Sequence, residues 1–335
     1  MFLKAGFHFR RCLIFGEGYD ILSFRERKGF YMELAAIIFR QILTMAVYMA
    51  AGYFLYKSGK ITKEGSKNLA TMLLWLIIPC VMLKSFCTEY SRERFMQLFS
   101  STLLAGFCLV LSLVIARLLY PKTPVDQFAA GYSNAGFMGI PLVTATFGQE
   151  AAFFLVGYVG FLNIFQWTLG TSLLRGEKVS LHWKQFVNPF FIAPVVGIAL
   201  FVSGLGTRVP EVLLGAVSGI AGLNGPIAMI VLGVYLAQTK LKELFVQPRL
   251  YVLSLVRLLL IPLITCGCML LIPGDHSVKL TVLTAAAAPV GANVAVYSQL
   301  YDRDYTYACQ TVAISTLLSI VTMPLILTLG NLLGV

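Results

Sequence analysis

The stretches GYSNAGFMGIP (131–141) and AAAAPVGANVAVYSQ (285–299) decide the fold of this chain. Both place glycine, proline and asparagine in the middle of segments that are otherwise apolar and long enough to cross a membrane. Inside a bilayer, helix-breaking residues are tolerated only where protein or a water-filled cavity satisfies the freed backbone groups. Both stretches are therefore expected to be broken helices that face the protein interior.

The rest of the chain has the composition of a polytopic membrane protein. Of its 335 residues, 58% are hydrophobic and 12% are charged, whereas about 25% of a soluble domain is charged. Apolar runs of about 17–25 residues predict ten membrane-spanning helices. Their predicted limits are 34–56, 66–87, 95–119, 126–147, 150–173, 188–205, 210–238, 248–272, 277–300 and 304–333. This all-α design leaves no room for a separate soluble domain.

Charge and residue usage exclude several classes of function. The net charge of +11 comes from short basic runs between apolar segments, so it indicates orientation signals rather than a nucleic-acid surface. The seven cysteines include no C-x-x-C pair, and no predicted span contains a histidine. A metal site and a serine nucleophile with a histidine base are both disfavoured. We expect a membrane protein without cofactor, metal or enzymatic activity.

The two halves of the chain resemble each other. A G-x-x-L-x-x-S-G pattern ends the first span from Gly52 and recurs from Gly197 at the end of the sixth, 145 residues later. Pro79 of the second span likewise corresponds to Pro226 of the seventh, and we expect structural or coupling roles for both prolines. Because five helices per half is an odd number, the second copy must insert upside down. The sequence thus predicts a five-plus-five inverted repeat, typical of secondary transporters, with helices four and nine broken.

This organisation divides the chain into a tail (1–31), a first repeat (32–173), a short cytoplasmic loop (174–187) and a second repeat (188–335). Loops after odd-numbered spans hold thirteen Lys and Arg residues and loops after even-numbered spans hold five, which places the odd loops in the cytoplasm. Both termini then lie outside the cell's inner or plasma membrane. The tail carries six basic residues on that outer side, so a native start at Met32 is an alternative.

The two broken helices predict a binding site where they cross. Two half-helix N-termini would present unpaired N–H groups to one small volume, which suits a carboxylate. Asn134 and Asn293 would add neutral amides, although such residues also join helices to one another in bundles. The candidate substrate-binding residues at this crossing are Asn134, Gly139, Pro141, Pro289, Gly291 and Asn293.

Four further polar residues lie within predicted spans. Asn163 and Gln166 are three residues apart on one helix face, where they either line the cavity or join helices. Arg257 is the basic residue well inside a span, and we favour a structural tether over direct substrate contact. Asn224, beside Pro226, has either a scaffold role or a role in the substrate site, and we favour the scaffold role.

The segment NAGFMGIPL (134–142) resembles the NxxxMGIPL segment of the auxin efflux carrier family, in its bacterial permease branch. APVG (288–291) is similar to the second crossover of that family, and VRLLLIP (256–262) resembles its VRxxxxP pattern. The resemblance covers nearly all of residues 32–335. It implies a scaffold of spans 1, 2, 6 and 7, and a moving transport domain of spans 3–5 and 8–10. The chain departs from the plant exporters in having Ser133 before the asparagine, where they have proline, and in its short central loop.

The expected function is transport of a small organic anion by an elevator-type alternating-access mechanism. The resemblance implies a carboxylate such as malate or an auxin-like acid, and Na⁺ or H⁺ is a candidate coupling ion. An anion channel or a sensor with the same fold is the alternative. A homodimer through helices 1, 2, 6 and 7 is the expected assembly in the lipid bilayer.

The loop bias makes the orientation testable. A single cysteine near Lys178, in a background without other cysteines, is expected to resist an impermeant thiol reagent added to intact cells, because residues 174–187 lie in the cytoplasm. Ready labelling at this position would reverse the predicted orientation.

Overall fold

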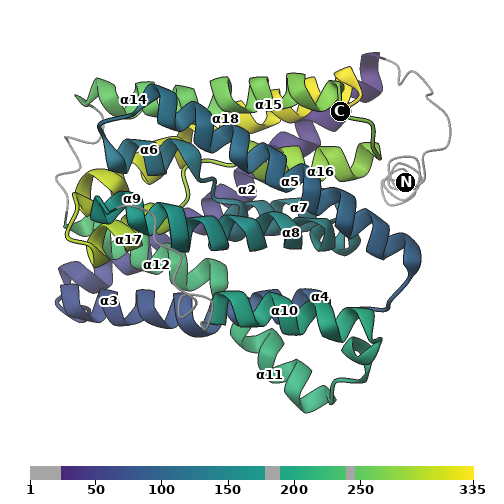
Figure 1. The fold of residues 1–335 in the computed structure, drawn as a ribbon. Coiled ribbons are helices and arrows are strands. Elements are labelled where there is room, and N and C mark those ends of the chain that lie inside the picture. Colours follow the sequence, from purple (N-terminus) through teal and green to yellow (C-terminus); the bar gives the residue numbers. More distant parts are fainter. Residues whose placement is uncertain (1–23, 178–188, 239–245) are drawn as a thin grey trace.

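The computed structural model describes residues 24–177, 189–238 and 246–335, and these form helices without a β-sheet (Figure 1). Residues 1–23 of the predicted tail and 178–188 of the predicted central loop lie outside the described residues. The first described helix begins at Phe24, ten residues before the first predicted span, and the domain boundary predicted at residue 31 stays a prediction. Arg25, Glu26 and Arg27 favour helix intrinsically and extend it beyond the predicted span.

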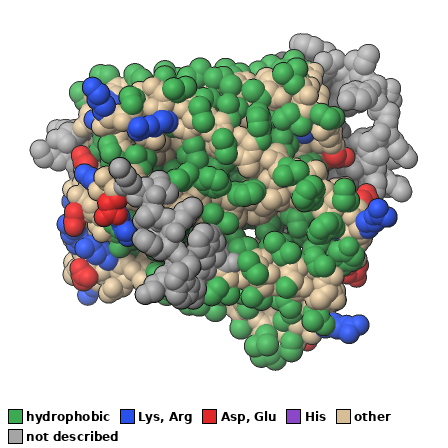
Figure 2. Space-filling view, in the orientation of Figure 1, with side chains coloured by type: hydrophobic (Ala, Val, Ile, Leu, Met, Phe, Trp, Pro, Cys, Tyr) green, Lys and Arg blue, Asp and Glu red, His purple; other side chains and the backbone are tan. Residues whose placement is uncertain are grey.

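Six stretches of the described chain are long and apolar enough to cross a membrane, judged by length and composition. They are Lys63–Phe86, Arg92–Leu119, Ala151–Arg175, Glu211–Ala237, Pro248–Leu270 and Tyr305–Leu333. Each coincides with a predicted span to within a few residues, which confirms an all-α polytopic membrane protein. On the face drawn in Figure 2, apolar side chains cover the middle and charged side chains gather at the two ends. The count of ten spans and the repeat stay predictions.

The helices pack in two groups, which we call the first and second group. The first group holds α2 (Phe24–Lys57), α3 (Lys63–Met72), η1 (Leu73–Ile77), α4 (Ile78–Phe86), α10 (Pro189–Val202), η5 (Leu205–Arg208), α11 (Glu211–Gly222) and α12 (Asn224–Ala237). Within it, α2 packs along α12, and α4 packs on α10 and α11. A Cβ on Gly52 would lie 2.0 Å from the carbonyl oxygen of Ile230, so the backbones of α2 and α12 touch there.

The second group lies mostly on the side of the molecule opposite α3, α4, α10 and α11 in Figure 1, and α2 of the first group extends obliquely into it. It holds α5 (Arg92–Leu119), α6 (Pro124–Gly131), η2 (Ala135–Gly139), α7 (Ile140–Phe147), α8 (Gln149–Phe165), η3 (Gln166–Gly170), α9 (Thr171–Arg175), α14 (Pro248–Leu255), η6 (Val256–Leu260), α15 (Ile261–Leu270), α16 (His276–Ala287), α17 (Asn293–Leu300) and α18 (Tyr305–Leu333). In it, α5 packs on α8 and α16, and α18 packs on α14 and α17.

An Ile-Pro pair follows a π-helical turn in three places. The pairs 78–79, 140–141 and 261–262 come directly after η1, η2 and η6, and each proline is the second residue of the next α-helix. Proline has no N–H to donate to the i−4 carbonyl, and its ring clashes with that carbonyl. The wider π turn before each proline accommodates the missing hydrogen bond and the proline ring. Such turns are frequent at functional sites.

Candidate functional site

Both stretches that break the helical pattern are non-helical in the structure. The chain leaves helical geometry between α6 and η2, over residues 132–134, and again between α16 and α17, over residues 288–292. In each break, a backbone N–H donates to a carbonyl oxygen of the other break rather than of its own helix. The Asn134 N–H donates to the Pro289 carbonyl oxygen (2.8 Å), and the Gly291 N–H donates to the Tyr132 carbonyl oxygen (3.0 Å). The two breaks therefore lie against each other and are joined by backbone hydrogen bonds.

Ser133 and Val290 lie opposite each other at the centre of this antiparallel pairing. The Val290 N–H has no backbone partner in this pairing and donates instead to the Ser315 Oγ of α18 (3.1 Å). A Cβ on Gly291 would lie 2.9 Å from the Ser133 carbonyl oxygen. Glycine is required at this position because the two backbones approach so closely.

Arg257 joins the first halves of the two broken helices. Its side chain is fully buried. Its Nε donates to the Ala288 carbonyl oxygen (3.1 Å), and its Nη1 donates to the Ala130 carbonyl oxygen (3.2 Å) and the Ser112 Oγ (3.1 Å). Its Nη2 donates to the Ala286 carbonyl oxygen. These carbonyls belong to the C-terminal ends of α6 and α16, where the helix dipole is negative. The contacts support the structural role proposed for Arg257.

The second halves of the broken helices begin at a small cavity. Asn134 and Gly136, at the start of η2, line it together with Ala292 and Asn293, at the start of α17. The first N–H groups of a helix have no partner within the helix and carry partial positive charge. Two such ends therefore border one volume, which we call the amide cavity. In α17 the Val294 and Ala295 N–H groups already donate to the Gly291 and Ala292 carbonyl oxygens (3.0 and 3.1 Å).

Four asparagines line the amide cavity. They are Asn134, Asn163 of α8, Asn224 of α12 and Asn293. The cavity measures about 20 Å³, which is room for about one water molecule. Among the 13 lining residues there is no charged side chain, so the polarity of this site comes from the amides, Ser133 and the helix ends.

Several of these amides lack hydrogen-bond partners among the described residues. Asn134 is 2% exposed, and neither its Nδ2 nor its Oδ1 has a partner. The Oδ1 of Asn293 is also unpaired, while its Nδ2 donates to the Gln166 Oε1 (2.7 Å). A buried polar atom without a partner costs about 1–3 kcal/mol. Such a group of unpaired amides is expected where a ligand supplies the missing bonds.

The structure separates the predicted substrate-binding residues into two sets. Asn134, Gly291, Asn293 and Asn163 line the amide cavity, joined by Asn224, for which a scaffold role was favoured. The other four predicted residues do not line the amide cavity. Gly139 packs against α16, Pro289 supplies a carbonyl to the pairing, Gln166 holds Asn293, and Pro141 is the second residue of α7. The substrate-binding role of both sets remains a proposal.

Asp126 is a residue that the sequence analysis missed. It lies in the first turn of α6, at the edge of a predicted span, where a charge is unremarkable in the sequence. In the structure it is 1% exposed. Its carboxylate accepts hydrogen bonds from the Tyr307 Oη (2.6 Å) and the Arg249 Nε (3.1 Å). This ion pair, between the buried Asp126 and the exposed Arg249, and the Tyr307 hydrogen bond tie α6 to α14 and α18.

A second, larger cavity adjoins the amide cavity, and we call it the vestibule. It measures about 750 Å³ and lies between α2, α4, α5, α7, α8 and α12. Val81, Gly136, Phe137 and Asn224 line both cavities. At the junction the Asn224 Nδ2 donates to the Gly136 carbonyl oxygen (3.2 Å), so a side chain of the first group bonds the backbone of the second.

A family model described as "Membrane transport protein" matches residues 37–182 and 177–327. An "Uncharacterized transporter" of Methanothermobacter thermautotrophicus is 27% identical over 300 residues, which is 85% of this chain and 95% of the relative. A "Putative malonate transporter" of Rhizobium meliloti is 25% identical over 276 residues, which is 76% of this chain and 84% of the relative. An uncharacterized transporter of Methanocaldococcus jannaschii is 21% identical over 297 residues, which is 85% and 96% of the two chains.

Replacing Arg257 tests whether it holds the crossing together. Arg257→Met would leave three buried carbonyl acceptors without their donor, and each costs about 1–3 kcal/mol. We expect the melting temperature of the purified protein in detergent to fall by about 5 °C or more. Arg92→Met, at an exposed position on α5, serves as the control. An unchanged melting temperature for Arg257→Met would contradict the tether.

Proposed function

Because the chain belongs to the membrane transport protein family, we propose that it is a secondary transporter of small carboxylates, with malonate and malate as the leading candidates. The strongest support for this proposal is the position of Asn134. Asn134 is buried with both ends of its amide unpaired, at the point where two half-helix N-termini meet. A carboxylate oxygen is an acceptor, and the N–H groups and amide nitrogens gathered there are donors.

The neutral character of the amide cavity suits a carrier. A lysine or arginine in the site would bind an anion tightly through charge-assisted hydrogen bonds, which would slow the release of the anion. Amides and helix dipoles attract an anion without a fixed charge. Either a gradient of the anion alone or a coupling ion such as Na⁺ or H⁺ then drives transport.

Helix contacts support the proposed inverted repeat of five plus five spans. Gly52 of α2 lies against the backbone of α12, that is, span one against span seven. Gly197 of α10 lies against Phe86 of α4, that is, span six against span two. The two glycines are equivalent in the sequence repeat, and the partner spans are exchanged as an inverted repeat requires. Such contacts fit a scaffold formed by the first group, through which a homodimer would also form.

The contacts between the two groups support alternating access. At one end, the Tyr235 Oη donates to the Gln299 Oε1 (2.8 Å) and the Tyr305 Oη donates to the Gln238 Oε1 (2.9 Å). The Lys63 ammonium lies 5.0 Å from the centre of the Tyr305 ring. At the other end the groups are separated by the vestibule. With the orientation predicted from the loops, the sealed end is cytoplasmic and the hollow end is external.

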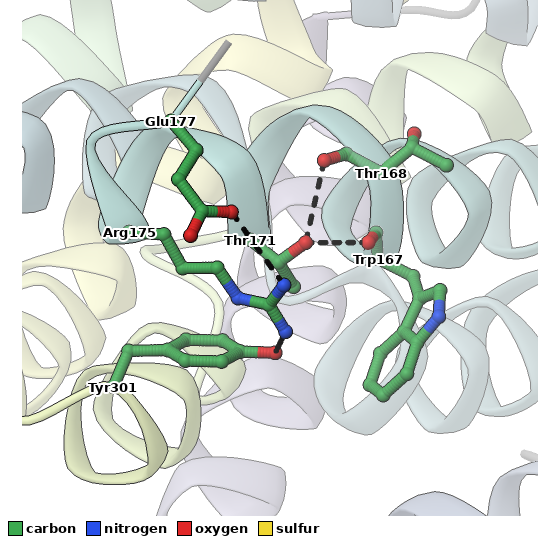
Figure 3. Close-up of polar contacts among 6 residues, drawn as sticks. All are labelled: Trp167, Thr168, Thr171, Arg175, Glu177 and Tyr301. Carbon is green, nitrogen blue, oxygen red and sulfur yellow. Dashed lines mark hydrogen bonds and ion pairs between the residues drawn. The ribbon is translucent and has the colours of Figure 1, made fainter. Parts of the chain in front are cut away.

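The second group is connected internally at its sealed end. Arg175 of α9 donates to the Tyr301 Oη after α17 (3.1 Å) and lies over the Tyr301 ring, 4.6 Å from its centre (Figure 3). Arg175 also forms an ion pair with Glu177 (3.7 Å). Since Arg257 joins α6 and α16 in the same group, the broken helices are fixed to their neighbours. A rigid-body, elevator-type movement of the second group past the first would carry the amide cavity with it.

Exchange measurements separate a carrier from a channel of the same fold. In proteoliposomes, preloading with unlabelled malonate is expected to accelerate uptake of labelled malonate, since each return of a loaded carrier resets the site. Malate, lactate, citrate and indole-3-acetate, with and without Na⁺ and H⁺ gradients, complete the screen. Uptake that neither saturates nor responds to internal malonate would indicate a channel.

Asn134→Ala tests the substrate site itself. A hydrogen bond to a charged group contributes about 1.5–3 kcal/mol, so we expect the apparent dissociation constant of the transported anion to rise about ten- to hundredfold. The melting temperature should not fall, because Asn134 has no side-chain partner to lose. Asn68→Ala, at an exposed position on α3, is the matched control. Wild-type affinity in Asn134→Ala would remove the main side-chain support for this site.

A further inference from the structure

At the sealed end, the described residues form two layers of hydrogen bonds between the first and second groups. The outer pair joins Gln238, after the end of α12, to Tyr305, at the start of α18, and both side chains are partly buried. The inner pair joins Tyr235 of α12 to Gln299 of α17, and these residues are 0% and 2% exposed. Because Tyr235 comes about one helical turn before Gln238, and α12 begins at the amide cavity, the inner pair is the layer closer to that cavity.

The inner pair leaves buried polar atoms without hydrogen bonds. The Gln299 Oε1 accepts from the Tyr235 Oη, but the Gln299 Nε2 has no partner among the described residues, and neither has the hydroxyl of the buried Ser298. The outer pair differs, since the Gln238 Nε2 donates to the Val234 carbonyl oxygen (3.1 Å). Water or a ligand that reached the inner pair would supply the missing bonds. Opening this layer therefore breaks one hydrogen bond and allows others to form.

One short helix connects the inner pair to the candidate site. α17 begins with Asn293 at the amide cavity and carries Gln299 six residues later, which is about 9 Å along the helix axis. A helix of two turns moves as one body, so a displacement of its first residue also displaces Gln299. An anion that contacts Asn293 would therefore act on the inner pair through α17.

We propose that the hydrogen bond between Tyr235 and Gln299 is the gate that closes the sealed end, and that the Gln299 amide lines the path of the carboxylate when this gate opens. The inference rests on the proposed transport of carboxylates and names the residues that control release of the anion. Once the pair separates, the Tyr235 hydroxyl and the Gln299 Nε2 are two donors that face the opening, and a carboxylate oxygen or water accepts from both. The bonds gained on opening offset the bond lost, as a carrier that opens this end in every cycle requires.

Cys309 is a native reporter for this gate. It is 0% exposed, and its Sγ donates to the Leu232 carbonyl oxygen of α12 (3.6 Å), so it lies between the two groups about one helical turn from Tyr235. Cys108 of α5, which is 1% exposed, lies within the second group and serves as an internal control. N-ethylmaleimide reacts with thiols that become exposed, and peptide mass spectrometry measures both cysteines in the purified full chain.

Tyr235→Phe removes the hydrogen bond of the gate and keeps the aromatic ring. We expect modification of Cys309 to become about two- to tenfold faster, the effect of losing one hydrogen bond from the closed state, while Cys108 keeps its wild-type rate. Tyr301→Phe is the matched control, because it loses a hydrogen bond with Arg175 at the same end but within the second group. It should leave the Cys309 rate unchanged.

Three results would overturn the gate. One is a wild-type rate at Cys309 in Tyr235→Phe. The others are an equal rise at Cys108 in that variant, or an equal rise at Cys309 in Tyr301→Phe, since each indicates general loosening instead of a local opening.

Exchange measurements then connect the gate to transport. A maleimide adduct on Cys309 would hold the two groups apart, so malonate exchange in proteoliposomes should fall in proportion to the modified fraction of Cys309. Cys309→Ala, which keeps the other cysteines, should retain more exchange after the same treatment. Complete modification of Cys309 with unchanged exchange would contradict the gate. Failure of the transport proposal is distinguishable, because wild-type proteoliposomes would then exchange no carboxylate at all, while the modification rates in Tyr235→Phe would still test the gate.

Discussion

The backbone pairing between residues 132–134 and 289–291 is the constraint on which the rest of this structure depends. A helix cannot be broken inside a bilayer unless its freed N–H and C=O groups find partners. Here each break supplies the partners of the other, so neither break would be stable alone. Arg257 satisfies the carbonyl ends of the first halves, and the second halves begin at the amide cavity. The same pairing of the two breaks therefore stabilises the fold and forms the candidate site.

In this arrangement the buried positive charge and the positive helix ends lie in two separate places. The buried cation, Arg257, faces the negative ends of α6 and α16, where it is neutralised by backbone carbonyls. The positive ends of η2 and α17 border a cavity lined by neutral amides. Two further cations, Lys84 and Arg94, are among the residues that line the vestibule. An anion in the amide cavity would thus be held by amides and dipoles rather than by a charged side chain, which favours release on the other side of the membrane.

The sequence predicted those features that follow from local composition. Apolar length located six spans, and glycine, proline and asparagine at mid-span located both breaks and the residues Asn134, Gly291 and Asn293 at the cavity. It could not distinguish Gly139, which packs on α16, from the lining residues, because both lie in one short motif. It also missed Asp126, whose burial depends on Arg249 and Tyr307, more than a hundred residues away in the chain. Such long-range pairs leave no periodic signal.

A crystal structure of the protein with bromomalonate would test the account most directly. The bromine atom gives an anomalous peak that locates the ligand independently of the protein coordinates. The account predicts a peak in an enlarged amide cavity, with a carboxylate at the N-terminal ends of η2 and α17 and within hydrogen-bonding distance of Asn134. A well-occupied ligand elsewhere in the molecule, with the amide cavity closed and empty, would contradict the claim that the crossing of the two broken helices forms the transport site.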